Sequence, residues 1–406
     1  MSELSYLEKL LDGVEVEWLP LGEVSALRRG RVMSKGYLTE NFGPYPVYSS
    51  QTANNGKIGS INTFDFDGEY ISWTTDGANA GTVFYRTGKF SITNVCGLIT
   101  LKSKYSLIYK FLFYWLTIEA KKHVYSGMGN PKLMSHQVEN IPVPIPCPDN
   151  PEKSLAIQSE IVRILDKFTA LTAELTAELN MRKKQYNYYR DQLLSFDEEQ
   201  EKPIYLEKLL DGVEVEWKLL GDASFFEIAN NGRKPVKSSL RIAGKTPYYG
   251  ANNIQDYVDG YTHDGEYVLI AEDGSASLEN YSIQYATGKF WANNHVHVVR
   301  GKTRVNSRFL FHYLHIVNFI PFLTGGVRAK LTKGQLIEIS VPIPCPDNTE
   351  KSLAIQAEIV RILDKFDTLT NSITEGLPRE IELRQKQYEY YRDLLFSFPK
   401  PETVSN

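Results

Sequence analysis

Cysteine is scarce in this chain, which has three among 406 residues, and this scarcity excludes a fold held together by disulfides. Cys96, Cys147 and Cys345 have no second Cys or His at zinc-ligand spacing, so we predict no metal site and a reducing, cytoplasmic location. The longest apolar patch, residues 309–323, is interrupted by polar residues and is too short to cross a bilayer. No apolar run follows a basic start at the N-terminus, so we expect no secretory segment.

Motifs for nucleotide hydrolysis and base methylation are also missing. The sequence contains no Asn/Asp-Pro-Pro-aromatic tetrapeptide of an amino-methyltransferase. Two Gly-Lys pairs, at 88–89 and 288–289, precede Phe and lack the upstream glycine of a phosphate-binding loop. Asp65, Asp67 and Glu69 would share one face of a strand, but the second half of the chain keeps only the glutamate, so we interpret them as a solvated edge. These absences count against an enzyme.

What the chain does contain is a repeat. Three tracts recur about 200 residues further on, nearly unchanged, and the stretches between them are dissimilar. Such a repeat predicts two copies of one unit that present the same surface twice, to two copies of a partner. The paired tracts are 6–18 and 205–217, 143–168 and 341–366, and 181–196 and 383–398.

Charge separates the repeated from the unrepeated parts. Residues 26–140 hold 13 basic and 7 acidic residues (net +6), and residues 225–338 hold 13 and 9 (net +4). The remainder holds 19 basic and 33 acidic residues (net −14), so the overall charge of −4 hides the division. Phosphate neutralisation needs Lys and Arg where a nucleic acid lies, so the unrepeated stretches predict DNA or RNA binding.

The long repeated tracts predict helices. Asp149 or Asn150 can cap a helix after the PCPDN turn, and Pro151 suits its first turn. Apolar residues then follow a heptad seam, and the first helix is predicted for 152–195, about 66 Å at 1.5 Å per residue. The predicted seam residues are Ile157, Ile161, Ile164, Phe168, Leu171, Leu175 and Leu179 in the first copy, and Ile355, Ile359, Ile362, Phe366, Leu369 and Ile373 in the second.

The two helices differ at their centres. A tandem TAEL at residues 172–179 inserts a stutter into the first seam. In the second copy the sequence Gly376-Leu377-Pro378 predicts a kink or a break. Heptad spacing alone leaves open whether the two helices pair parallel, antiparallel or as separate short hairpins.

The unrepeated stretches predict a mixed α/β fold with short strands such as 69–73 and 266–270. Despite low identity they share landmarks in the same order, which predicts one fold with two different surfaces. The landmark pairs are Pro46 and Pro247, Gly68 and Gly265, Asp76 and Asp273, Thr87 and Thr287, Phe111 and Phe309, and Lys132 and Lys330.

The duplicated tracts, the landmarks and the helical repeats together resemble the DNA specificity (S) subunit of type I restriction-modification systems, and the TAEL tandem resembles the IC subgroup. The resemblance implies an α+β fold of two mixed α/β target recognition domains separated by a long antiparallel coiled coil, with pseudo-two-fold symmetry. The implied divisions are residues 1–150 and 199–348 for the recognition domains, and 151–198 and 349–406 for the helical spacer regions.

The same resemblance implies function. Each recognition domain would read one half of a bipartite, asymmetric target in double-stranded DNA, and the repeats would dock two methyltransferase subunits, which restriction subunits then join. The chain itself would be non-catalytic and bind no cofactor, with S-adenosylmethionine, ATP and Mg implied for the partner subunits. A coiled-coil assembly scaffold that does not contact DNA remains the alternative.

Candidate DNA-binding residues are polar side chains near the shared landmarks. Arg, Lys, Asn and Gln read base edges, whereas Ser, Thr and Tyr contact phosphates. The candidates for backbone contacts are Lys89, Lys132, Lys289, Arg328 and Lys330. The candidates are Ser49, Ser50, Gln51, Asn54, Asn55, Lys57, Thr74, Thr75, Asn79, Lys89 and Lys132 in the first stretch, and Arg233, Lys234, Asn252, Asn253, Ser275, Lys289, Arg328 and Lys330 in the second.

Overall fold

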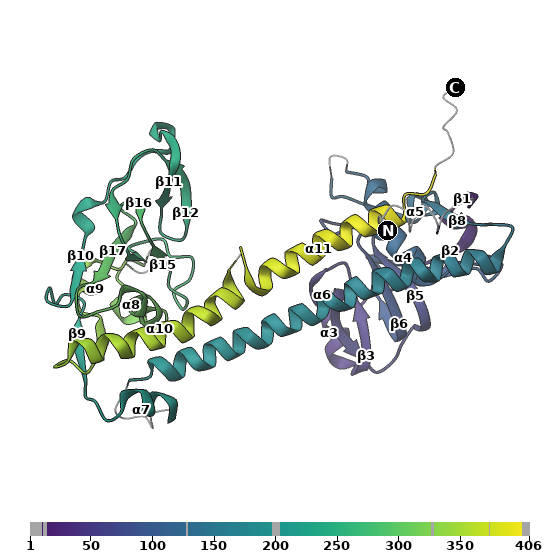
Figure 1. Cartoon of the computed structure of the whole chain (residues 1–406). Helices are drawn as coiled ribbons and strands as arrows, with labels where there is room; N and C mark the ends of the chain where they lie inside the picture. Colours follow the sequence, from purple (N-terminus) through teal and green to yellow (C-terminus); the bar gives the residue numbers. More distant parts are fainter. Residues whose placement is uncertain are drawn as a thin grey trace. The chain divides into compact units, whose positions relative to one another are not determined.

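The computed structural model divides into two compact units (Figure 1). Unit 1 takes residues 1–174 with 381–406, and unit 2 takes residues 175–380. The predicted site residue Arg328 and the predicted seam residue Ile373 lie outside the described residues. The structure describes residues 10, 14–126, 129–196, 204–325, 329–372 and 374–399.

Unit 1 is a mixed α/β body with part of two long helices. Its elements are β1 (Val16–Pro20), α2 (Leu21–Val24), β2 (Ser25–Arg29), α3 (Lys35–Glu40), β3 (Phe42–Tyr48), η1 (Ala53–Gly56), β4 (Lys57–Ile61), β5 (Phe66–Thr74), β6 (Val83–Ile92), β7 (Cys96–Leu101), α4 (Tyr109–Glu119), η2 (Ala120–His123), α5 (Ser135–Glu139), β8 (Pro142–Pro146), the first part of α6 (Pro151–Leu194) and most of α11 (Gly376–Leu395).

Unit 2 repeats this order after the second part of α6. Its elements are α7 (Ile204–Leu210), β9 (Val215–Leu219), β10 (Phe226–Ile228), η3 (Asn230–Gly232), η4 (Ser238–Leu240), β11 (Ala243–Tyr249), β12 (Ile254–Val258), β13 (His263–Asp264), β14 (Tyr267–Ala271), β15 (Ile283–Ala286), β16 (Lys289–Ala292), β17 (Val296–Gly301), α8 (Ser307–Leu314), η5 (Ile320–Phe322), α9 (Lys333–Leu336), β18 (Ser340–Pro344), α10 (Thr349–Asn371) and the start of α11.

The unrepeated parts of the two units, residues 26–140 and 225–338, are called the recognition regions below. They share one strand arrangement. In unit 1 the strands form one sheet in the order β2-β7-β5-β6-β3-β4, and in unit 2 they form two sheets, β10-β17-β14-β15 and β12-β11-β16-β13. All pairs are antiparallel except β3 with β6 and β11 with β16, which are parallel. These parallel pairs match in register, since Val47 faces Ser91 and Tyr248 faces Trp291. The predicted mixed α/β fold in two copies is confirmed.

Glycines stand where the strands of unit 2 pass from one sheet to the other, and unit 1 has glycines at the matching place of its single sheet. Gly68 faces Gly88 across the β5–β6 pair, with φ of 132° and 76°. Gly265 and Gly288 have φ of 132° and 66° at the matching place in unit 2, where the strands are interrupted. Side chains other than glycine rarely adopt such angles, which accounts for the Gly landmarks that the two stretches share.

The repeated tracts are not helical throughout. Tract 6–18 enters β1, which pairs antiparallel with the proline-rich β8, and β9 pairs with β18 in the same way. Proline lacks an N–H donor and is tolerated in such two-stranded edges. The start and the end of each recognition region are therefore joined by one repeated pair of strands.

The long helices follow the prediction with specific corrections. Helix α6 is continuous over 44 residues, Asn150 caps it through Lys153, and α10 ends at Asn371 before α11 begins at Gly376, so the predicted cap and break are confirmed. Ile157, Ile161, Ile355 and Ile359 are buried. Seven predicted seam residues are only half-buried, namely Ile164, Phe168, Leu175, Leu179, Ile362, Phe366 and Leu369.

The prediction was wrong for one seam residue. Leu171 is 37% exposed, whereas Leu165 and its repeat Leu363, which the heptad count omitted, are completely buried. The reason is that this part of each helix packs on its recognition region as well as on a second helix, and a strict heptad describes only helix-to-helix contact. Aromatic rings mark the antiparallel pairing inside each unit: Phe168 stacks on Tyr391, and its repeat Phe366 stacks on Tyr189.

Repeated polar residues fasten each helix to its recognition region. Gln158, fully buried on α6, accepts from the amide of Ile108 and donates to the Ser106 carbonyl. Its repeat Gln356 makes the same two bonds to Asn306 and Arg304. The start of α4 and the start of α8 are thus held in the same way.

A repeated aspartate is paired with different residues in the two units. Asp166 binds Lys110 and the Tyr114 hydroxyl, both at 2.6 Å, and Asp364 binds Arg308 and His312, both at 2.7 Å. Burial disfavours the ionised form of Asp364, but hydrogen bonds from His312 and Arg308 outweigh it and lower its pKa below 3.8.

We predict that Asp364→Asn destabilises unit 2 by about 1 kcal/mol, since a charge-assisted bond at a partly exposed site is lost. Because the folded pKa is depressed, the aspartate stabilises the fold above pH 3.8 and loses this effect as the pH falls through the folded pKa. Urea unfolding followed at several pH values measures the difference between variant and parent. An equal midpoint at neutral pH would contradict the prediction, and exposed Asp347→Asn is the matched control.

Candidate DNA interface

Four loops meet at one end of the unit 1 sheet. We call residues 49–56, 75–82, 93–95 and 129–132 loop cluster 1. Backbone bonds join them: the amide of Thr75 donates to the Val95 carbonyl, and the amide of Gly77 donates to the Pro131 carbonyl. These loops follow β3, β5 and β6, so the strands position them.

Side chains complete loop cluster 1. The Asn79 amide donates to the Ser50 carbonyl at 3.0 Å, and the Thr93 hydroxyl bonds Ser49 at 2.9 Å. Arg86, buried from solvent, donates to the Asn55 carbonyl at 2.8 Å and lies 3.6 Å from the Tyr48 ring centroid. Burial lowers the pKa of Arg86 to about 10, so it stays charged at neutral pH.

The same loops meet in unit 2. We call residues 250–253, 272–282, 293–295, 324–325 and 329–330 loop cluster 2. The Glu272 amide donates to the His295 carbonyl, in the position that Thr75 and Val95 occupy in unit 1. Asn252 corresponds in role to Asn79, since its amide donates to the Gly274 carbonyl at 2.9 Å. The clusters are therefore built alike from different side chains.

Most of the predicted site residues lie in or beside these clusters, but several are engaged inside the protein. Thr74 and Thr75 are fully buried, and their hydroxyls bond Asn79 and Asp76, so the structure removes both from the surface. Asn252 also accepts from Ala276 and Ser282, and Ser275 bonds Ser277. Hydroxyl and amide groups near Asp76-Gly77 were expected to face DNA, and they hold the loops instead.

Arg233 and Lys330 share one carboxylate. Arg233 lies 2.5 Å and Lys330 lies 2.9 Å from Glu272. Burial opposes ionisation of Glu272, but the hydrogen bonds from Arg233 and Lys330 prevail and lower its pKa. Arg233 also donates to the Val296 carbonyl and is only 19% exposed, so it supports loop cluster 2 from within.

Other predicted residues remain on the surface. Asn54 and Asn55 are exposed at the tip of loop cluster 1, with φ of 49° and 54°, and Asn253 is exposed in loop cluster 2. Lys57, next to loop cluster 1, and Lys132, within it, are exposed. Ser49, Ser50 and Gln51 are half-buried, and the Gln51 amide donates to the Lys57 carbonyl at 2.6 Å.

Lys89 and Lys289 lie apart from the clusters. Each follows one of the glycines at the corner between the sheets. Lys89 pairs with Asp67 at the start of β5, whereas loop cluster 1 adjoins the other end of β5, at Thr74. Their ammonium groups stand over Phe64 and Tyr261, at 4.8 and 4.7 Å from the ring centroids. The sequence landmark they share marks the corner and not the loop cluster.

Two carboxylates of the set Asp65, Asp67 and Glu69 are engaged within the protein. Asp65 binds Arg31, and Glu69 accepts from the Tyr85 hydroxyl. Within the described residues, no group of three or more His, Cys, Asp or Glu is arranged to hold a metal ion. In the same part of the chain, no helix has the length and apolar character needed to cross a membrane.

Comparison with known proteins decides the family. The model for the type I restriction modification DNA specificity domain matches residues 13–182 and, a second time, residues 214–383. The chain belongs to this specificity family. The two matches cover the two copies that the repeat predicted, each with its strand pair, recognition region and helix.

Relatives of the type I specificity family match over different lengths. The chain is 39% identical to the EcoR124I/EcoR124II specificity subunit of Escherichia coli over 100% of both chains. It is 61% identical to a putative specificity subunit of Haemophilus influenzae over 204 residues, which span 49% of this chain and 51% of that relative. The stronger identity therefore concerns half of each protein.

Solved structures share the fold at low identity. The S subunit of a type I system from M. genitalium superimposes with a TM-score of 0.64 at 18% identity, over 96% of this chain and 98% of that one. A chain from a structure describing assembly and conformational transition of the type I R-M system gives 0.53 at 15%, over 94% and 97%. The specificity-subunit fold is thus shown for the whole chain.

One basic surface was missed from the sequence. Residues 234–245 carry Lys234, Lys237, Arg241 and Lys245 and contain no Asp or Glu. Of these four residues, only Lys234 is among the predicted site residues, because that prediction used landmarks that both stretches share. A count of charge in short windows would have found this segment.

Proposed function

We propose that this chain is the non-catalytic DNA-reading subunit of a type I restriction-modification complex, with each unit reading one half of a bipartite, asymmetric target. One observation carries the proposal: the two units keep the same frame, down to Gln158 and Gln356, but display different polar groups on loop clusters 1 and 2. A frame used twice with two surfaces suits a split target whose halves differ in sequence.

Charge and relatives support DNA as the partner. The unrepeated regions are basic, at net +6 and +4, whereas the rest of the chain is acidic. A scaffold that does not contact DNA would leave this distribution unexplained. The relatives matched over most of the chain carry names of type I restriction enzyme specificity subunits.

For assembly, we propose that the repeats dock two methyltransferase subunits and that restriction subunits join them. S-adenosylmethionine, ATP and Mg would then act in those subunits. Tyr188 on α6 and its repeat Tyr390 on α11 support such docking, because they are 60% and 56% exposed, whereas their neighbours Tyr189 and Tyr391 stack on Phe366 and Phe168. Exposed aromatic residues are enriched at protein interfaces.

The helical regions are proposed to set the spacing between half-sites. The TAEL tandem at 172–179 includes the boundary between the units, which falls between Glu174 and Leu175. A helix rises 1.5 Å per residue, so one TAEL unit adds about 6 Å, which corresponds to one or two base pairs at about 3.4 Å each.

The first test assigns half-sites to units. The chain is expressed with its methyltransferase partner, and methylated sites in host DNA are mapped by sequencing. We expect Asn54→Gly with Asn55→Gly to relax one half-site, since glycine keeps the left-handed turn, and Asn253→Ala to relax the other. Lys104→Ala, an exposed cation in the turn between β7 and α4, is the control. Loss of both half-sites from either variant would contradict separate reading.

The second test concerns the spacer. Variants with one, two and three TAEL units should methylate the same two half-sites at spacings that differ by one or two base pairs per unit. Methylation maps give both the half-sites and the spacing. Altered half-site sequences at a constant spacing would refute the ruler.

The third test concerns docking. Tyr188→Ser and Tyr390→Ser should each reduce methyltransferase binding to one copy per chain, and the double variant should abolish it. Mass measurement of the purified complex reports the stoichiometry. Tyr257→Ser, an exposed tyrosine of the unrepeated β12, is the matched control and should keep two copies. Two bound copies on the double variant would place the docking surface elsewhere.

A further inference from the structure

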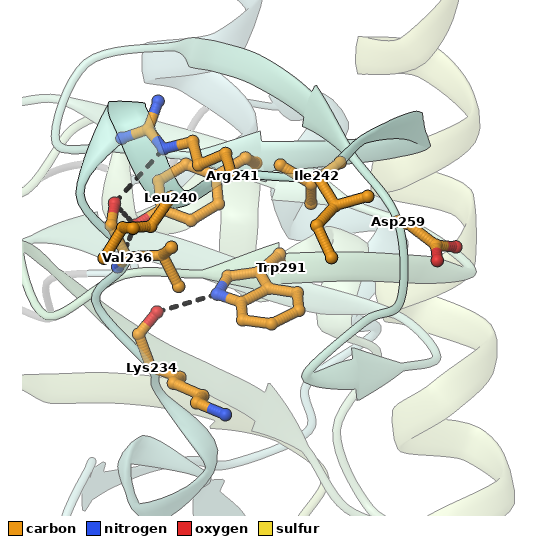
Figure 2. Close-up of a pocket in the computed structure, with 9 residues that line it drawn as sticks. Lys234, Val236, Leu240, Arg241, Ile242, Asp259 and Trp291 are labelled. Carbon is orange, nitrogen blue, oxygen red and sulfur yellow. Dashed lines mark hydrogen bonds between the residues drawn. The ribbon is translucent and has the colours of Figure 1, made fainter.

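A basic segment of unit 2 covers an apolar cavity. Residues 234–245 lead into β11 and carry four cations without a carboxylate. Beneath them is a cavity of about 290 Å³, shown in Figure 2. Its apolar walls come from Val236, Leu240, Ile242, Tyr248, Val258 and Trp291.

Polar atoms around the cavity are bonded within the protein. The Trp291 indole donates to the Lys234 carbonyl at 2.7 Å, and the Tyr248 hydroxyl accepts from the Val236 amide at 3.0 Å (Figure 2). Arg241 donates to the Val236 carbonyl and lies 3.3 Å from Asp256. The cavity therefore offers carbon surface to an occupant, with Asp259 as the carboxylate that lines it.

Two aliphatic side chains are left exposed in this lining. Leu240 is 69% and Ile242 is 71% exposed, although both belong to the wall of a cavity. Exposing aliphatic surface in this way costs free energy, which an occupant would recover by covering it. Lys234, Lys237 and Lys245 are exposed and give the surrounding surface the sign that attracts phosphate, whereas Arg241 is paired with Asp256.

The matching place in unit 1 carries different side chains. The amide of Asp259 donates to the Ile242 carbonyl, and the amide of Asn62 donates to the Asn41 carbonyl, so Ile242 and Asn41 are equivalent. At the places of Ile242 and Trp291, unit 1 has the polar residues Asn41 and Ser91. A partner that docks on repeated surfaces would see no repeat here, whereas two different DNA half-sites would require the difference.

We propose that the unit 2 cavity receives the 5-methyl group of a thymine in the half-site that unit 2 reads, while Lys237 and Lys245 contact phosphates. In the major groove the thymine methyl is the apolar group that a base edge presents, and apolar side chains recognise it. The exposed carbon of Leu240 and Ile242 would contact that methyl group. The proposal rests on the proposed function and names a specificity-determining contact within it.

The test removes the methyl group alone. The complex with its methyltransferase partner is bound to duplexes of its own methylated target, in which each thymine of the unit 2 half-site is replaced in turn by uracil. We expect one position at which uracil weakens binding about four-fold, the worth of one buried methyl group. Leu240→Ser with Ile242→Ser should weaken binding to the thymine duplex and abolish the difference between thymine and uracil at that position.

Two further measurements separate the explanations. Lys237→Ala should weaken binding to thymine and uracil duplexes equally, and the serine variant should keep its selectivity for the unit 1 half-site, which shows that it is folded. A complex that binds its target but shows no thymine position sensitive to uracil, or a serine variant that keeps the full difference, overturns the cavity assignment alone. A parent complex without sequence-selective binding overturns the proposed function as well.

Discussion

The structure depends on how each repeated helix is fastened to a recognition region by buried polar bonds. Gln158 and Gln356 are fully buried amides whose oxygen and nitrogen both find backbone partners just before α4 and α8. An unpaired buried amide would cost about 1–3 kcal/mol, so the bond geometry leaves little freedom in where the helix lies. Apolar packing around Ile161 and Ile359 supplies attraction but less direction.

This fastening permits divergence elsewhere. Asp166 and Asp364 are the same residue of the repeat, yet one is met by Lys and Tyr and the other by Arg and His. Each recognition region has therefore found its own way to neutralise a fixed carboxylate. The strand pairs β1–β8 and β9–β18 join the start and the end of both regions in the same way, so the loops between them can differ while the frame is kept.

Local sequence rules predicted the parts of the fold that depend on local chemistry. Asn150 as a cap and the break before Gly376 follow from backbone preferences that a few residues determine. Leu165 was missed because its burial depends on a recognition region far away in sequence, and Thr74 and Thr75 were misplaced because their burial also depends on the fold. Residue type indicates what a side chain can bind, whereas burial, a property of the fold, decides whether it faces DNA.

Unit 2 carries two physically different kinds of surface, at opposite ends of β11. In the loop clusters, the side-chain amides of Asn79 and Asn252 donate hydrogen bonds to neighbouring loops. These bonds fix the backbone before any ligand binds and reduce the entropy lost on binding. Around the unit 2 cavity, polar atoms are likewise satisfied, but aliphatic carbon is left exposed beside cations. Hydrogen-bonding groups select a base by its donors and acceptors, and exposed carbon selects by a methyl group. A domain that holds both on one rigid frame can distinguish sequences that either surface alone would confuse.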